Sequence, residues 1–321
     1  MNGLYKFSFF KVLCFCLLSV FFSSNCIDFN KNKNVLAQSP KAETKQNFPK
    51  NNDDIGKFII KYEPTNSNPE IRRIFIESQI FDKIINNLNN SGLIMRQNIP
   101  VTFQDCGDPN AYWSYKNKEI IICYENTAYD LFLFHEKAKY PIEKAMEKSI
   151  NETIFAFYHE LGHALIDTLA LNAVGQEEDT VDEFASVMLY RNHDKNFAEE
   201  VVLDSSEYYE LLYKEKEKSP SWDEHTPHDK RLFNLVCFVY GSNPEKYEKI
   251  FIEKFYLLDE ENIASEDNLK ARKEKCQQEF TKKTDSWNRL LLPHYAIKNN
   301  YQRQSFPINN SPGMSERGIY W

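Results

Sequence analysis

The pattern of apolar and polar residues predicts a small N-terminal sheet followed by a mostly helical chain. Short runs of β-branched and aromatic residues between turn residues are typical of strands, and three occur at Phe58–Glu63, Ile99–Phe103 and Glu119–Tyr124. The turn-rich stretch between the last two runs offers a further short strand near Trp113. Apolar residues that recur every three or four positions predict helices at 70–90, 154–167, 176–189, 230–240, 247–258 and 269–292. We therefore expect an α+β fold with the sheet packed on a helical core.

The N-terminus reads as a targeting segment. An apolar run of eleven residues, Val12–Phe22, follows two lysines and suits the core of a signal peptide, being too short to span a bilayer comfortably. Small residues near Ala37 predict cleavage after it, with a lipid-modified Cys26 or an uncleaved anchor as alternatives.

Two further segments have the polar composition of unstructured chain. Residues 38–54 are rich in Lys, Asn, Pro and Gln, and residues 297–321 in Asn, Gln, Ser and Pro. We interpret them as a disordered linker and a flexible tail. This leaves residues 55–296 as one domain.

The charge of the chain excludes some partners. Four of the 39 basic residues and one of the 47 acidic residues lie in 1–37, so the remainder has 35 bases, 46 acids and a net charge of −11. An acidic chain of this kind is not expected to bind nucleic acid or an anionic membrane surface. Membrane contact is expected only through the leader, if it is uncleaved or lipidated.

Cysteine usage favours export. Three of the seven cysteines lie in the leader, and the other four are Cys106, Cys123, Cys237 and Cys276. An even number in an exported chain indicates disulfides. Three pairings can be drawn, and the most economical in sequence is Cys106–Cys123 with Cys237–Cys276. None of the four has the spacing of a zinc knuckle.

The helix at 154–167 contains a His-Glu-x-x-His motif from His159 to His163. Residues four apart share one helix face, so both imidazoles can bind one metal ion. Glu160 can then take a proton from a water molecule on that metal. Ordinary core or surface histidines are the alternative, but the flanking residues are apolar and buried charged groups need partners. Gly162, which costs about 1 kcal/mol against Ala in a helix interior, indicates a close approach to the backbone beside the metal.

A catalytic zinc needs three protein ligands and one open position. The acidic start of the helix at 176–189 is the expected source of the third. Glu178 and Asp182 share a helix face, so we assign Glu178 as ligand and Asp182 as hydrogen-bond acceptor for the outer nitrogen of a liganding histidine. The ligand could instead be one of the neighbouring acids, Glu177, Asp179, Asp182 or Glu183. The alternative without metal is an acidic cluster that only complements the helix dipole.

The order His159-Glu160-x-x-His163, Glu178, Asp182 resembles the glutamate-zincin (gluzincin) pattern. Residues from about 55 to 290 resemble an uncharacterised bacterial metallopeptidase domain family, on these motifs: Cys106-Gly107, Cys123-Tyr124-Glu125, Glu177-Glu178-Asp179, Asp223-Glu224-His225 and Leu235 to Gly241. The resemblance implies a zincin-like fold, one catalytic zinc ion and a peptide or protein substrate. One departure is that the gap from His163 to Glu178 is shorter than in thermolysin-like enzymes.

Two further expectations follow from the resemblance to zincins. A distal histidine or tyrosine often stabilises the oxyanion in these enzymes, which makes His225 a candidate, with a helix-capping or surface histidine as the alternative. The strand before the motif helix often pairs with an extended substrate. Here that strand would be Ile120–Glu125, and the alternative is an interior strand.

Taken together, these patterns predict an exported zinc metallopeptidase, periplasmic or extracellular, with Glu160 as general base. Two other functions compete with it. One is a non-catalytic secreted or envelope binding protein that retains a zincin fold, and the other is a zinc amidase acting on cell-wall peptide.

Overall fold

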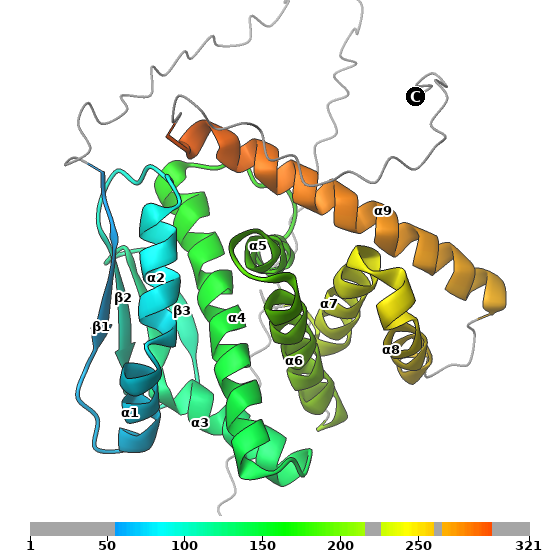
Figure 1. The fold of residues 1–321 in the computed structure, drawn as a ribbon, viewed down its shortest axis with the longest axis horizontal. Helices are drawn as coiled ribbons and strands as arrows, with labels where there is room; N and C mark the ends of the chain where they lie inside the picture. The colour runs from blue at the N-terminus through cyan, green and yellow to red at the C-terminus, as the bar shows by residue number, and fades with distance from the viewer. Residues whose placement is uncertain (1–54, 216–225, 260–264, 297–321) are drawn as a thin grey trace, which may run out of the picture. The chain divides into compact units, whose positions relative to one another are not determined.

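The computed structural model describes residues 55–215, 226–259 and 265–296. The predicted leader, linker and tail lie outside these residues, and so does His225. Within them the chain is α+β, since four strands near the N-terminus are followed by a series of helices (Figure 1).

The strands form one sheet in the order β1-β2-β4-β3. Its members are β1 (Phe58–Tyr62), β2 (Ile99–Gln104), β3 (Ala111–Ser114) and β4 (Glu119–Cys123). β1, β2 and β4 run parallel, whereas β3 pairs with β4 in the antiparallel direction. The central strands β2 and β4 are largely buried, which explains why their sequences are nearly continuous apolar runs.

β4 is an interior strand, and this corrects one expectation. Its two edges are already paired with β2 and β3, so its backbone groups are not available to an added peptide. Of the two readings of Ile120–Glu125, pairing with substrate is therefore wrong and the alternative, an interior strand, is confirmed for β4. The last two residues of the predicted strand, Tyr124 and Glu125, belong to the next helix, α3 (Tyr124–Phe132). The edge strand that contacts the motif helix is β3.

The helix predicted at 70–90 is two helices. α1 (Pro69–Ser78) and α2 (Ile80–Asn90) are separated by Gln79, whose φ of 55° lies in the left-handed region. The spacing of the buried residues breaks at the same place, because Phe75 and Phe81 are six residues apart rather than three or four. The break lets both helices turn their apolar faces toward the core, with Phe75 fully buried.

The motif lies in the longest helix, α4 (Ile142–Leu169), which follows a short π-helical turn at Leu133–Lys137. α4 contacts β3 and β4 on one side and α3, α5 (Glu177–Asn192) and α6 (Lys195–Lys214) on others. Figure 1 shows it between the sheet and the later helices. As a result His159, Glu160 and His163 are only 7%, 7% and 8% exposed.

Five α-helices follow α4 in the described residues: α5 (Glu177–Asn192), α6 (Lys195–Lys214), α7 (His228–Ser242), α8 (Pro244–Leu257) and α9 (Glu266–Leu291). α6 was not predicted from the sequence, although its start is well marked because the Asp194 carboxylate accepts hydrogen bonds from two backbone N–H groups. None of the described helices has both the length and the apolar character needed to cross a membrane.

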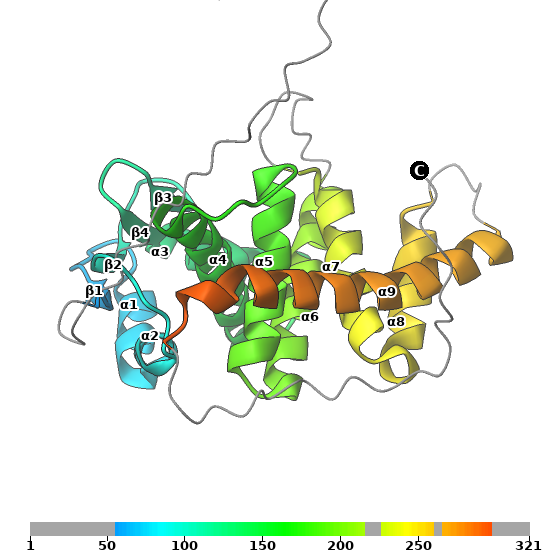
Figure 2. The ribbon, with the colours of Figure 1, turned by 90° about the horizontal axis from the view of Figure 1, so that it is seen from above.

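Two disulfides lie within the described parts of the chain, in the pairing that the sequence favours. Cys106–Cys123 links the segment after β2 to the end of β4, and Cys237–Cys276 links α7 to α9. α9 runs across α5 and α7 (Figure 2). The second disulfide therefore secures the helix that covers them.

Candidate metal centre

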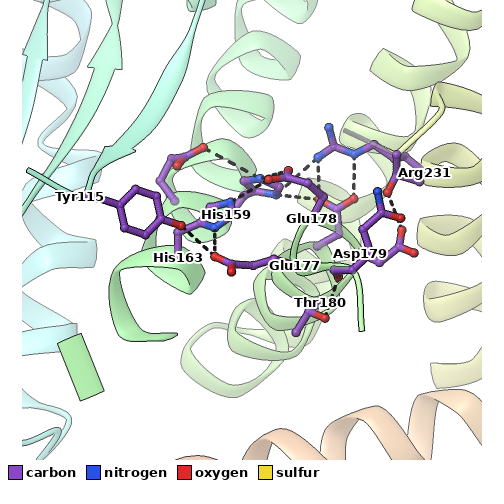
Figure 3. Close-up of polar contacts among 12 residues, drawn as sticks. Tyr115, His159, His163, Glu177, Glu178, Asp179, Thr180 and Arg231 are labelled. Atoms are coloured by element: carbon purple, nitrogen blue, oxygen red, sulfur yellow. Dashed lines mark hydrogen bonds and ion pairs between the residues drawn. The ribbon is translucent and has the colours of Figure 1, made fainter. Parts of the chain in front are cut away.

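Three side chains from two helices converge at the middle of α4. One carboxylate oxygen of Glu178 lies 3.2 Å from Nε2 of His159, and the other lies 3.3 Å from Nε2 of His163 (Figure 3). One ligand atom from each of the three lies within 4.8 Å of the others. α4 supplies the histidines, and the first turn of α5 supplies the carboxylate.

This geometry fits a metal better than a hydrogen-bonded cluster. Two donors that each stand about 2.1 Å from a tetrahedral zinc ion are about 3.4 Å apart, close to both distances between Glu178 and the histidines. Oε2 of Glu178 is buried, yet it has no hydrogen-bond partner within the described parts of the chain. Two imidazoles and one carboxylate are also a ligand set that catalytic zinc uses.

A glycine allows α5 to approach α4 this closely. A Cβ atom on Gly162 would stand 2.9 Å from the side chain of Val181 and 3.0 Å from that of Phe184. The close approach expected at Gly162 is therefore that of α5 itself. Val181 and Phe184 flank Asp182 on α5, so the contact at Gly162 also fixes which α5 side chains face the histidines.

The outer nitrogens of both histidines have carboxylate partners on α5. Oδ1 of Asp182 lies 2.8 Å from Nδ1 of His159, and Oε1 of Glu177 lies 2.7 Å from Nδ1 of His163. Such partners fix the ring orientation and direct Nε2 toward a metal. Asp182 thus lies where the sequence analysis placed a partner of a liganding histidine, while the partner role of Glu177 was not foreseen.

The other two acids considered as ligands point elsewhere. Asp179 accepts a hydrogen bond of 2.6 Å from the hydroxyl of Thr226, which lies just before α7, and pairs with Lys230 of α7. Glu183 lies 2.8 Å from the ammonium group of Lys283 on α9. Both carboxylates join α5 to later helices, and neither faces the histidines.

Glu160 lies on the same side of α4 as the two Nε2 atoms. Its Oε1 is 4.0 Å from Nε2 of His159, and its carboxylate is hydrogen-bonded by the backbone of Trp113 in β3. Trp113 in turn donates from its indole nitrogen to Asp167, which fixes β3 to α4. Burial raises the pKa of Glu160, although the two histidines oppose that shift. The carboxylate is thus held beside the candidate metal position in a surrounding that strengthens it as a base.

The carboxylates and the imidazoles shift one another's pKa. Burial disfavours the charged form of His159, but its contacts with the carboxylates of Asp182 and Glu178 outweigh burial and raise its pKa to about 9. Burial likewise disfavours the ionised Glu178, but the two histidines outweigh it and hold its pKa well below the usual range. Because metal ligands must be deprotonated, protons compete with a metal ion at this centre.

Sequence reasoning missed two residues around the centre. Arg231 of α7 donates to both carboxylate oxygens of Asp182, and Tyr115, which follows β3, donates a hydrogen bond of 2.9 Å to Glu177. Both come from parts of the chain far from the motif. Their only sequence signal is their residue type, which is common on protein surfaces.

A second group of potential ligands does not form a metal site. Sulfur and carboxylate atoms of Cys106, Cys123 and Glu125 lie close together, but the two sulfurs are joined in a disulfide. Glu125 instead accepts hydrogen bonds from the backbone N–H groups of Cys106 and Gly107. The group stabilises a turn.

A pair of acids is buried two helical turns before the motif. Asp130 of α3 and Glu152 of α4 are 0% and 3% exposed. Each has one carboxylate oxygen without a hydrogen-bond partner in the described residues. Burial raises the pKa of Glu152 to about 8, and burial together with the charge of Glu152 raises the pKa of Asp130. At neutral pH this pair therefore holds a proton.

We expect Glu152→Gln to flatten the dependence of stability on pH. A carboxyl whose folded pKa is raised adds stability below its unfolded pKa of about 4.5 and loses that stability as pH rises toward its folded pKa of about 8. The wild type should lose up to about 1.4 kcal/mol per pH unit from this group in that window. Urea unfolding from pH 5 to 8 with chelator measures the difference. The exposed Glu143→Gln on α4 is the control, and parallel curves for wild type and Glu152→Gln would contradict the prediction.

The comparisons with known proteins agree with the centre's chemistry. A protein-family model described as "Putative metallopeptidase" matches residues 62–291, which is more than half of the chain. Searches of curated proteins and of solved structures give no significant match. The chain therefore belongs to this metallopeptidase family.

Proposed function

We propose that the protein is an exported zinc-dependent peptidase of the zincin type, with His159, His163 and Glu178 as metal ligands. The observation that carries the proposal is the Glu178 carboxylate between the two Nε2 atoms, at distances of 3.2 and 3.3 Å. Membership of a metallopeptidase family supports a hydrolase that acts on peptide or protein substrates.

The chain's own residues supply the proton transfers. A zinc ion held at this centre would provide a Lewis acid that polarises a water molecule and the scissile carbonyl. Glu160 takes a proton from the attacking water and passes it to the leaving nitrogen of the peptide. Its raised pKa suits both steps, because the group must accept a proton and then release it near neutral pH. His225, outside the described residues, remains a prediction as an oxyanion donor.

The substrate is expected to bind along β3. This strand is an edge of the sheet, and its Trp113 backbone contacts Glu160. An extended peptide that adds to a sheet edge gains main-chain hydrogen bonds. Addition at β3 places the peptide backbone beside the general base.

Export is supported by two observations. The apolar run near the N-terminus is typical of a signal peptide. The two disulfides are typical of proteins that fold in an oxidising compartment.

The test combines metal analysis with an assay of hydrolysis. The purified protein should contain about one zinc ion per chain and hydrolyse a generic protein substrate, lose activity with chelator and regain it with added zinc. Metal without hydrolysis of any of a broad set of substrates would favour the non-catalytic binding protein. Hydrolysis restricted to cell-wall peptide would favour the amidase. A protein that binds no zinc would overturn the proposal.

A further inference from the structure

Two consecutive basic residues of α7 pair with acids of α5. Lys230 pairs with Asp179, and Arg231 pairs with Asp182. Both pairs join the same two helices, but the two acids have different second hydrogen-bond partners. The second partner of Asp179 is the Thr226 hydroxyl, whereas that of Asp182 is His159.

The contact between Arg231 and Asp182 uses two parallel hydrogen bonds. Nε of the guanidinium donates to Oδ2 at 2.7 Å, and Nη2 donates to Oδ1 at 2.6 Å. The Arg231 and Asp182 side chains are only 11% and 8% exposed. A planar guanidinium matched in this way fixes the rotation of a carboxylate, which a lysine ammonium cannot do.

Arg231 is itself held in place from the other side. Its guanidinium carbon lies over the ring of Tyr209 on α6, 4.1 Å from the centroid, in a cation–π contact. Asp182 therefore hydrogen-bonds a group that α6 and α7 position together. Oδ1 of Asp182 is hydrogen-bonded both by Nη2 of Arg231 and by Nδ1 of His159.

This arrangement determines which nitrogen of His159 carries its hydrogen. A guanidinium has only donors, so Nη2, which lies 3.4 Å from Nδ1, cannot accept from that nitrogen. Oδ1 of Asp182 is the acceptor in reach, so Nδ1 bears the hydrogen when the ring is neutral, as it must be to bind a metal. Nε2 is then left with its lone pair on the side of Glu178 and His163.

We propose that Arg231 is a positioning residue for the metal centre, acting through Asp182 on the orientation and tautomer of His159. The inference rests on the proposed function, because it assumes that His159 binds the metal. Its effect should appear in metal affinity and in the geometry of the bound metal, and it does not depend on turnover.

The experiment compares three variants of the full chain: Arg231→Met, Arg231→Lys and Lys230→Met. Each is loaded with Co²⁺ in place of zinc, and both the dissociation constant and the visible absorption spectrum of the bound ion are measured. Loss of a hydrogen-bonding partner behind a metal ligand typically lowers affinity about 10- to 100-fold. Because Arg231 acts through that partner, Asp182, we expect a loss toward the lower end of this range and an altered spectrum in Arg231→Met. Arg231→Lys should also be impaired, because it keeps the charge but loses the paired geometry.

Lys230→Met is the matched control, since it removes an ion pair between the same two helices without touching a partner of His159. It should keep the affinity and spectrum of the wild type. Equal losses in Lys230→Met and Arg231→Met would overturn the inference, as would wild-type values in Arg231→Met. If Arg231→Met does not fold, Arg231→Lys decides by the same criteria. A wild type that binds neither Co²⁺ nor Zn²⁺ would overturn the proposed function and this inference together, whereas normal metal binding in the Arg231 variants would overturn the inference alone.

Discussion

Glu160→Gln is expected to abolish most peptide hydrolysis and to leave metal binding intact. The amide has nearly the same shape as the carboxylate but cannot take a proton from water, and removal of a general base typically costs about 10²- to 10⁴-fold in rate. Glu160 lies 4.0 Å from Nε2 of His159 and outside the trio of converging ligand atoms. The zinc content should therefore remain that of the wild type.

The measurement is kcat/KM on a peptide substrate together with zinc stoichiometry for the same preparation. Glu143→Gln is the control, since it makes the same chemical change in the exposed first turn of α4. If Glu160→Gln kept activity within a few-fold of the wild type, Glu160 would not be the general base. If it lost zinc together with activity, the carboxylate would be needed for the metal centre rather than for proton transfer.

The parts of the fold that could be predicted have a strong period in the sequence. The central strands β2 and β4 are largely buried on both faces and therefore read as apolar runs, and α5 and α7 have apolar positions at helical spacing. The break at Gln79 and the whole of α6 were missed. Gln79 adopts a left-handed conformation, which a glycine or asparagine at this position would have indicated but a glutamine does not. α6 buries several polar residues, Glu199, Asp204 and Glu210 among them, which obscures its apolar face.

The two histidines were predictable because they are close in sequence, whereas five acids of α5 remained possible as the third ligand. The spacing of His159 and His163 places both rings on one face of α4 in any helix. Which acid of α5 faces them depends on the rotation of α5 about its axis, which is fixed by the contact of Val181 with Gly162. The position of Arg231 depends on how α7 docks on α5. No periodicity within a single helix contains that information.

Glu178→Gln is the second change for which we expect a large effect, a loss of zinc affinity exceeding 100-fold. The substitution keeps the shape of the side chain and removes the negative charge that lies between two Nε2 atoms. Loss of a group that only supports a liganding histidine costs about 10- to 100-fold. Loss of a ligand should cost more, and hydrolysis should fall with the bound metal.

Substitution of the neighbouring acids allows the losses of zinc affinity to be ranked. Glu177→Gln and Asp182→Asn remove the partners of the outer nitrogens, so each should fall in the range of about 10- to 100-fold. Asp179→Asn changes the next residue along α5, whose carboxylate faces Thr226, and it should bind zinc like the wild type. Zinc affinities of the four folded variants decide the assignment, because only the true ligand should rank last by a clear margin. If Asp182→Asn or Glu177→Gln lost more affinity than Glu178→Gln, that acid would be the third ligand, and Glu178 would hold the two histidines in place from outside the metal's coordination shell.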